Sequence, residues 1–159
     1  MTRYLPWGIH GTVQETSEYI DEMEDKWESG ERAEYVIRPK DGEKNAGAIA
    51  GAGGLILDWE THTGYPAVWL RKPFWGRGYS GERASRLIEM AFERLDLDLV
   101  AVPVQKENEN SRRAVEKYVA AHGGQHDGIV RNATVRPTGE IVDHHRYTVT
   151  RDQYRNESG

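Results

Sequence analysis

The sequence contains no cysteine among its 159 residues. This absence excludes a disulfide framework, a thiolate metal site and a cysteine nucleophile. No apolar run approaches the roughly eighteen residues that a membrane span needs, and residues 1–11 lack the apolar segment of a signal peptide. A basic excess is also missing, because the formal net charge is −5. Since a phosphate-backbone binder normally shows clustered cations, we expect no nucleic-acid partner. The missing apolar segments lead us to expect a cytoplasmic protein without a membrane partner.

The length is typical of one domain with a sizeable core. We expect residues 1–159 to form that single domain, with residues 1–11 irregular at its start. Residues 151–159 are polar, and we expect them to be a frayed tail.

The most informative stretch runs from Pro66 to Leu95. It predicts a short apolar strand over 67–70, a glycine-bearing turn over 75–81 and then an amphipathic helix. The helix is indicated by apolar residues at one-face spacing, namely Ala84, Leu87, Ile88, Ala91, Phe92 and Leu95. The first N–H groups of a helix lack intrahelical partners and carry partial positive charge, so an anion binds there if the turn permits its approach. The three glycines of the turn, Gly76, Gly78 and Gly81, permit it.

Two nucleotide motifs compete for this turn. The nucleoside-triphosphate P-loop is excluded, because no Lys-Ser/Thr pair follows at the required spacing. The dinucleotide pattern Gly-x-Gly-x-x-Gly does fit the three glycines, and Asp96 or Asp98 lies near the expected distance for ribose binding. A Rossmann-like dinucleotide domain therefore stays open as a less favoured alternative.

The segments before this stretch predict one helix and two strands. A helix should begin within residues 12–16, where two threonines are candidate caps, and end at Gly30 after Ser29. Strands are expected over 33–38 and 46–59, the second with a kink at the glycines of 51–54. Residues 61–64 should form a hairpin loop.

The segments after it predict a central strand and a terminal hairpin. Residues 97–104 are almost wholly apolar, which suits a strand buried on both faces, parallel to 67–70 because a helix lies between them. Pro103 lacks an N–H, so we expect pairing to fail near it. A helix should follow Asn108, with Tyr118 among its inward residues, and end at 122–124. The last strands are expected over 128–131 and 145–150, with a turn at 138–140.

Two motifs carry a resemblance to a known family. Residues 75–80, Trp-Gly-Arg-Gly-Tyr-Ser, followed by Glu82, resemble motif A of the GCN5-related N-acetyltransferases (GNAT superfamily). They are most similar to the branch of RimJ/RimL-type ribosomal-protein N-alpha-acetyltransferases. Trp75 departs from the Gln or Arg that begins the motif, and Ser80 from its closing Gly or Ala. The run from Asn108 to Lys117, Asn-x-x-Ser-Arg-Arg-x-x-Glu-Lys, resembles motif B, although taken alone Asn108 is typical of a helix cap.

This resemblance, which covers about residues 49–154, implies an α/β fold. It predicts a mixed, mostly antiparallel sheet with a splayed parallel strand pair and helices on both faces. Acetyl-coenzyme A is then expected as co-substrate, with its pantetheine arm between the splayed strands, and no metal. The implied cofactor-binding residues are Trp69, Leu70, Trp75, Gly76, Arg77, Gly78, Tyr79, Ser80, Gly81, Asn108 and Ser111. The family's first strand and helix are missing or shortened, so we expect an exposed sheet edge that a homodimer partner could cover.

The resemblance further implies transfer of an acetyl group to a primary amine, either a protein N-terminus or a small amine. With no cysteine to carry the acetyl group, we expect direct transfer in a ternary complex. Ser111 is the favoured proton donor to the departing thiolate, and Tyr118 is the alternative. The general base stays open among Glu60, Asp58, Glu82, Asp143, His144 and His145. A non-catalytic acyl-coenzyme A sensor is the competing function.

Overall fold

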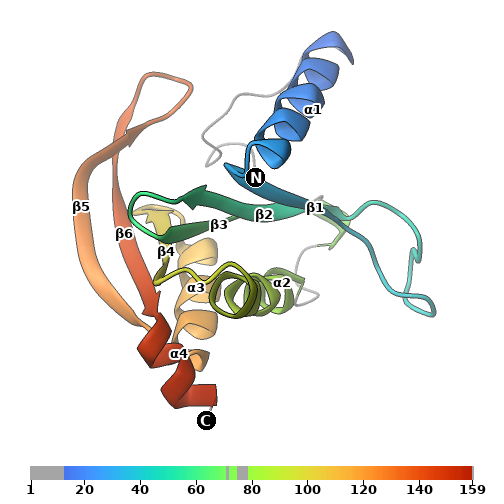
Figure 1. Cartoon of the computed structure of the whole chain (residues 1–159). Coiled ribbons are helices and arrows are strands. Elements are labelled where there is room, and N and C mark those ends of the chain that lie inside the picture. The colour runs from blue at the N-terminus through green and yellow to red at the C-terminus, as the bar shows by residue number, and fades with distance from the viewer. Residues whose placement is uncertain (1–12, 71, 75–78, 159) are drawn as a thin grey trace.

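The computed structural model describes residues 13–70, 72–74 and 79–158, which form a six-stranded sheet and four α-helices (Figure 1). In chain order the elements are α1 (Val13–Glu28), β1 (Arg32–Ile37), β2 (Gly51–Asp58), β3 (Thr63–Leu70), a 3₁₀ turn (Lys72–Phe74), α2 (Tyr79–Glu89), a π-helical turn (Met90–Arg94), β4 (Leu99–Gln105), α3 (Glu109–Ala121), β5 (Gln125–Val135), β6 (Ile141–Thr150) and α4 (Arg151–Ser158). The helix expected to begin within 12–16 begins at Val13, and the terminal hairpin is present with longer strands than predicted.

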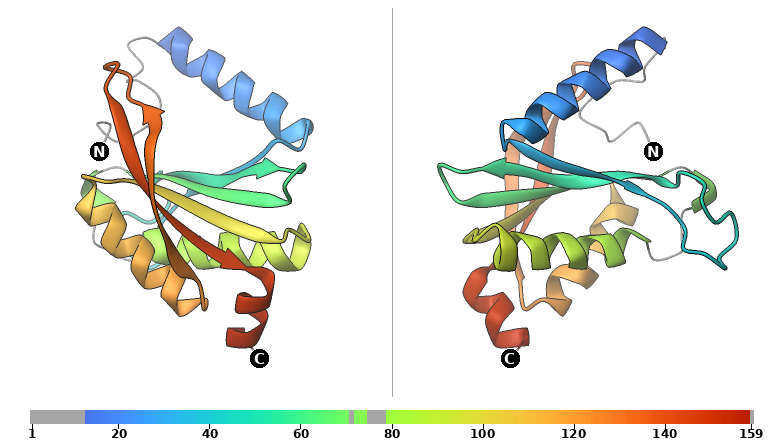
Figure 2. Two further views of the ribbon diagram at one scale, coloured as in Figure 1. Left: turned by 90° about the vertical axis from the view of Figure 1, so that its left-hand side faces the viewer. Right: turned by 45° about the vertical axis from the view of Figure 1, so that its right-hand side comes forward.

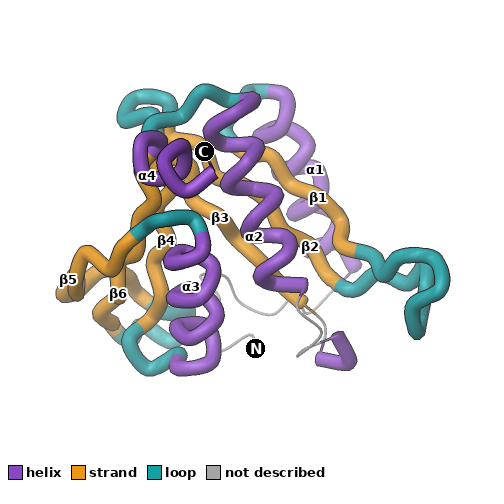
Figure 3. The backbone as a smooth tube through the Cα atoms, turned by 90° about the horizontal axis from the view of Figure 1, so that it is seen from below, coloured by secondary structure: helices purple, strands orange, loops and turns teal. Residues whose placement is uncertain are grey.

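The strand order in the sheet is β1-β2-β3-β4-β6-β5. Every neighbouring pair is antiparallel except β3 and β4, which are parallel. Helices α2, α3 and α4 lie on one face of the sheet, whereas α1 stands on the other (Figures 2 and 3). The predicted fold class is therefore confirmed: a mixed, mostly antiparallel sheet with helices on both faces. None of the helices in the described ranges is long and apolar enough to cross a membrane.

The core lies between the sheet and its α2–α3–α4 face. The predicted apolar side of α2 faces inward, with Ala84 and Ile88 completely buried, and Ala91 of the following π-helical turn is also completely buried. Helix α2 packs on β2, β3 and α3, and Val100, Val102 and Val104 of β4 belong to the same buried cluster. The prediction that this strand is central is thus confirmed, and burial of these side chains is the main stabilising contribution to the fold.

The glycine-rich segment differs from the prediction. Residues 46–48 form a turn, residues 49–50 have no regular structure, and β2 begins only at Gly51. The predicted kink is wrong, because β2 pairs without interruption with both β1 and β3. Close packing explains why glycine stands at these positions. A Cβ on Gly54 would overlap the carbonyl oxygen of Ala33, and a Cβ on Gly53 would lie 2.6 Å from Cδ of Arg83.

The predicted frayed tail is also wrong. Residues Arg151–Ser158 form α4, which covers one end of the core. Arg151 donates from Nε and Nη2 to the carbonyl oxygen of Leu97, at 3.0 and 2.7 Å. Tyr154 is buried against Phe92, and its hydroxyl donates to Glu93 at 2.7 Å. Tertiary contacts therefore hold a segment whose polar composition gives no sign of order.

Strand β1 is an edge of the described sheet. Whether the family's first strand and helix are shortened depends on residues 1–12, which lie outside the described part of the chain. The irregular start expected for residues 1–11 falls in the same segment.

Candidate active site

The parallel strands β3 and β4 separate soon after they begin. Their pairing consists of Thr63 with Leu99 and Gly64 with Val100. Beyond that point β3 stays with β2 as far as Leu70, while β4 stays with β6 as far as Gln105. The two halves of the sheet thus diverge because each strand follows its antiparallel partner.

The predicted cause of this splay needs correction. Pairing was expected to fail near Pro103, but it stops at Val100, and Pro103 keeps its register opposite Arg146 on β6. The missing N–H of the proline therefore does not open the sheet. It is tolerated because the β3 side of β4 is already unpaired there.

Two helices begin at the open end of the splayed pair. The chain leaves β3 through residues 71–78 and enters α2 at Tyr79, and it leaves β4 through a short turn and enters α3 at Glu109. Trp75, Gly76, Arg77 and Gly78 lie outside the described residues, whereas Tyr79, Ser80 and Gly81 form the first turn of α2. A Cβ on Gly81 would meet no atom within 4 Å, so this first turn is open on that side. Both helices therefore begin at the same end of the sheet, where their N-termini carry partial positive charge.

Asn108 is the N-cap of α3, as its sequence context predicts. Its Oδ1 accepts a hydrogen bond from the backbone N–H of Ser111 at 3.3 Å. This leaves the Nδ2 amide group of Asn108 as a donor toward a ligand. Ser111 lies in the first turn of α3 and is partly buried. The structure therefore brings together Asn108 and Ser111 at the end of β4.

Tyr118 occupies a different environment from Ser111. It is buried in the core between α2 and α3, and burial raises the pKa of its hydroxyl to about 12. It lies two helical turns beyond Ser111, about 10 Å along the axis of α3. Its phenol is therefore a packed core group that keeps its proton at neutral pH.

The histidines of β6 lie on opposite faces of the sheet. His145 is paired with Val104 and contacts His126, with 3.0 Å between Nδ1 of His145 and Nε2 of His126. His144 is paired with Gln105, on the face opposite α2 and α3. The Nε2 of His144 is buried and has no hydrogen-bond partner among the described residues, and burial lowers the pKa of this histidine.

Gln105 is fixed beside His144 by a buried arginine. Nε of Arg136 donates to Oε1 of Gln105 at 2.8 Å. The same guanidinium forms ion pairs with Glu107, at 2.8 Å, and with Glu140. This clamp joins the turn of the β5–β6 hairpin to the end of β4. These contacts therefore hold the end of β4 in place at the open end of the splay.

The remaining candidate bases are distributed elsewhere. Asp58 is the last residue of β2 and Glu60 lies in the exposed turn that follows, about 20 Å along β3 from its open end. Asp58 accepts the backbone N–H groups of Glu60 and Thr61, and hydrogen bonding in this turn lowers the pKa of its carboxyl group. Glu82, in the first turn of α2, pairs with Lys40 at 3.4 Å. Asp143 accepts from the N–H of Asn132 in the terminal hairpin. The structure does not bring Glu60 together with Ser111.

Trp69 and Leu70 lie on the part of β3 that has left β4. Their backbones pair with Ala52 and Gly51 of β2. One edge of this strand segment thus has a partner in the sheet, and the other faces the splay. Such an edge offers backbone donors and acceptors to an extended ligand.

Arg83 is the main feature of this region that sequence reasoning missed. It projects from the second turn of α2, and its Nη1 donates to the carbonyl oxygen of Ala67 on β3 at 2.5 Å. The adjacent glycine at Gly53 was the only sequence signal, because a bare position in a strand often marks a close neighbour.

The mixed sheet and its splayed parallel strand pair match the fold of the GNAT class. The acetyltransferase (GNAT) domain family model matches residues 1–118, and the chain belongs to that family. A search of curated proteins gives no match.

Solved structures share the fold at low sequence identity. A Microcin C7 self-immunity acetyltransferase, MccE, in complex with acetyl-CoA and AMP, is 16% identical with a TM-score of 0.77, covering 94% of this chain and 78% of that one. A spermidine N-acetyltransferase from Vibrio cholerae, in complex with CoA and spermine, is 15% identical with a TM-score of 0.77, covering 98% and 85%. A structure from T. thermophilus, provisionally assigned as an acetyltransferase, is 24% identical with a TM-score of 0.77, covering 99% and 78%.

Proposed function

We propose that this protein is an acetyl-coenzyme A-dependent N-acetyltransferase that moves an acetyl group directly to a primary amine. The observation that carries the proposal is the splay of β3 from β4 after Gly64 and Val100, with a helix starting at the open end of each strand. The alternative of a Rossmann-like dinucleotide domain has no support in this topology, because its sheet would be mostly parallel.

The coenzyme is proposed to bind along three consecutive features. The glycine turn and the first turn of α2, from Trp75 to Gly81, would hold the pyrophosphate through backbone N–H groups. The open edge of β3, including Trp69 and Leu70, would form sheet-like hydrogen bonds with the pantetheine arm. Asn108 would donate its free amide N–H to the same arm while its Oδ1 caps α3.

Ser111 is the proposed proton donor to the departing thiolate. It lies in the first turn of α3, at the open end of the splay, whereas Tyr118 is enclosed in the core. In the reaction the amine nitrogen bonds to the thioester carbonyl carbon, the C–S bond breaks, and the sulfur takes a proton. Backbone N–H groups on the open edge of β3 would stabilise charge on the carbonyl oxygen.

His144 is the proposed acceptor of the amine proton, directly or through water. Its buried Nε2 has no partner among the described residues, and its lowered pKa keeps the ring neutral at pH 7, as a base requires. It lies on the face of the sheet opposite Ser111, so donor and acceptor would approach the acetyl group from different sides. The other candidates pair with neighbours or lie at the far end of the sheet.

The acceptor is proposed to be a protein N-terminal amine, as in the RimJ/RimL-type branch, or a small amine. Spermidine is the named substrate of one structural neighbour, which supports a small polyamine as an equal candidate. We further propose that the protein acts in the cytoplasm and that its edge strand β1 pairs with a second copy.

Thiol release from acetyl-CoA in the presence of candidate amines tests this function. Ser111→Ala should lower kcat by about 10²-fold or more while the Kd for acetyl-CoA stays unchanged. Because Ser111 bonds Asn108 through its backbone N–H, the helix cap survives the substitution. Ser29→Ala, in the exposed turn after α1, is the matched control and should retain full activity.

Turnover that persists in Ser111→Ala would remove Ser111 from the reaction. Tight coenzyme binding by the wild-type protein, without turnover on any amine, would instead favour the non-catalytic sensor.

A further inference from the structure

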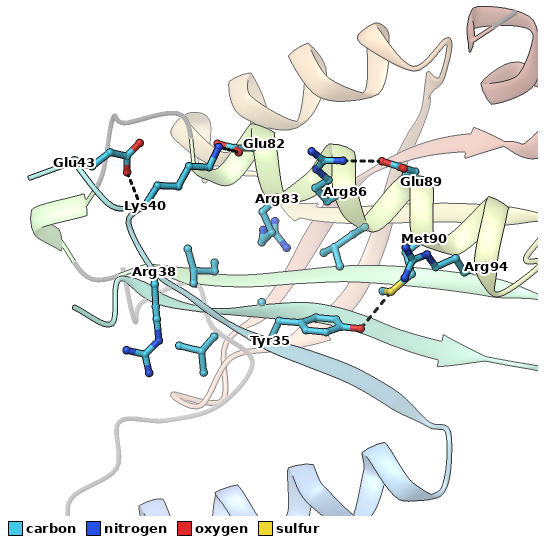
Figure 4. A pocket seen from close by; sticks show the side chains of 14 residues that line it. Tyr35, Arg38, Lys40, Glu43, Glu82, Arg83, Arg86, Glu89, Met90 and Arg94 are labelled. Atoms are coloured by element: carbon cyan, nitrogen blue, oxygen red, sulfur yellow. Dashed lines mark hydrogen bonds and ion pairs between the residues drawn. The ribbon is translucent and has the colours of Figure 1, made fainter. Parts of the chain in front are cut away.

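A groove lies beside α2, on the side where the edge strand β1 runs. The groove has a volume of about 470 Å³ and is lined by residues of α2, of the edge strand β1 and by Gly53 of β2 (Figure 4). α3 lies on the other side of α2 from β1 (Figure 3). The volume is in the range of small-molecule sites.

The groove is positively charged although the chain is acidic overall. Five basic and three acidic side chains line it, a local net charge of +2 against −5 for the whole sequence. The basic residues are Arg38, Lys40, Arg83, Arg86 and Arg94, and the acidic residues are Glu43, Glu82 and Glu89. The local field therefore favours an anion.

The carboxylates of the groove form ion pairs with only some of its basic side chains. Lys40 pairs with Glu82 at 3.4 Å, and Arg86 pairs with Glu89 at 3.3 Å. Within the described ranges, no carboxylate lies within ion-pair distance of Arg83.

Arg83 is the basic residue of the groove whose guanidinium lacks some of its hydrogen-bond and charge partners among the described residues. Its Nη1 binds the carbonyl oxygen of Ala67, but its Nε is buried and has no hydrogen-bond partner in the described part of the chain. The absence of a side chain at Gly53 is what lets it lie flat against the sheet. Burial lowers its pKa to about 10, and Tyr118 offsets this only in part. A buried cation with a neutral partner is costly unless a further group compensates it.

The walls of the groove also offer apolar contact. Tyr35 projects from β1 into the groove and is 45% exposed, and its hydroxyl donates to Sδ of Met90 at 3.4 Å. A methionine beside an aromatic ring is an adaptable surface for a flat ligand. The groove thus combines basic side chains that attract an anion with the aromatic side chain of Tyr35.

We propose that this groove is a second ligand site, which takes a small organic anion. Its carboxylate or phosphate group would lie against Arg83, with Arg86 and Arg94 beside it. Its apolar part would lie against Tyr35 and Met90. No described side chain of β3 or β4 is among the residues that line the groove, although Arg83 hydrogen-bonds the backbone of β3. The proposal does not depend on acetyl transfer.

Phenyl phosphate is a suitable probe, with inorganic phosphate for comparison, and isothermal calorimetry is the measurement. All titrations use the Gly78→Asp background, because an added carboxylate there repels phosphate from the glycine turn. Phenyl phosphate should bind with a millimolar or lower Kd and at least fivefold more tightly than inorganic phosphate. Arg83→Met should weaken it at least tenfold, whereas Arg155→Met, an exposed arginine on α4, should leave it unchanged.

Two further variants keep the test decisive if Arg83→Met does not fold. Arg94→Gln and Tyr35→Ala change exposed groove residues, and each should weaken phenyl phosphate at least threefold. The proposal is overturned if phenyl phosphate does not bind, if the groove variants bind it as tightly as their parent, or if the two phosphates bind equally. Acetyl-CoA binding, measured separately in the wild-type protein, reports on the catalytic proposal alone.

Discussion

Nη1 of Arg83 lies 2.5 Å from the carbonyl oxygen of Ala67, so the second turn of α2 is tied to β3 where that strand has already left β4. The coenzyme is proposed to use both of these elements, through the N-terminus of α2 and the open edge of β3. A single, partly buried side chain therefore links the two parts of the proposed site. It also faces the groove on the opposite side of α2.

The close approach of β1 and β2 predicts a strong effect at Gly54. Gly54→Ala should lower the free energy of unfolding by about 3 kcal/mol or more, because the new Cβ would overlap the backbone of Ala33. Urea denaturation measures this. Gly81→Ala is the matched control: its Cβ meets open space in the first turn of α2, so stability should stay the same or rise by up to about 1 kcal/mol. Equal stability of the two variants would contradict the tight packing.

The docking of α4 predicts an effect at Arg151. Its side chain is 20% exposed, binds the Leu97 carbonyl and forms ion pairs with Asp96 and Asp98, at 2.7 and 3.2 Å. Arg151→Ala should cost about 1–3 kcal/mol of unfolding free energy and increase amide hydrogen exchange across α4.

Arg155→Ala is the control for that substitution, because Arg155 is exposed on the same helix. It should leave both measurements unchanged. Rapid amide exchange across α4 in the wild-type protein would contradict the docked helix and support the frayed tail that the sequence alone suggests.

The proposed base predicts the acid limb of the pH–rate profile. Burial lowers the pKa of His144 below its usual 6.5. The imidazole therefore becomes protonated, and the rate falls, only when the pH drops through that lowered pKa. The profile of kcat/KM should therefore bend below pH 6.5. His144→Asn should lower the rate by about 10²-fold and remove this bend.

His62→Asn provides the control for the pH profile. His62 is exposed in the β2–β3 turn and has a positive φ, a conformation that asparagine tolerates. A bend that persists in His144→Asn would place the proton acceptor at another residue.

Local patterns in the sequence predicted the parts of the fold that local physics determines. The apolar face through Ala84 and Ile88 places α2, and the valine-rich run through Val100 places β4 at the centre of the sheet. Asn108 was predictable as a cap because short polar side chains satisfy helix N–H groups. These features depend on residues close together in the chain.

Long-range contacts explain what the sequence did not predict. Order in α4 depends on Arg151 meeting the Leu97 carbonyl, 54 positions earlier in the sequence. The role of Arg83 depends on a carbonyl group in β3 and on the bare backbone of Gly53 in β2. His144 could be named as one of six candidate bases, but only the sheet register shows which face of the sheet it occupies.

Calorimetric titration of acetyl-CoA into the wild-type protein and the Gly78→Asp variant tests the central claim most directly. The wild-type protein should bind with a Kd in the micromolar range, and the variant should lose this binding because its carboxylate repels the pyrophosphate. Ser29→Asp adds the same charge in the exposed turn after α1 and should bind like wild type. No binding by the wild-type protein, or equal binding by all three proteins, would contradict the proposed coenzyme site at the start of α2.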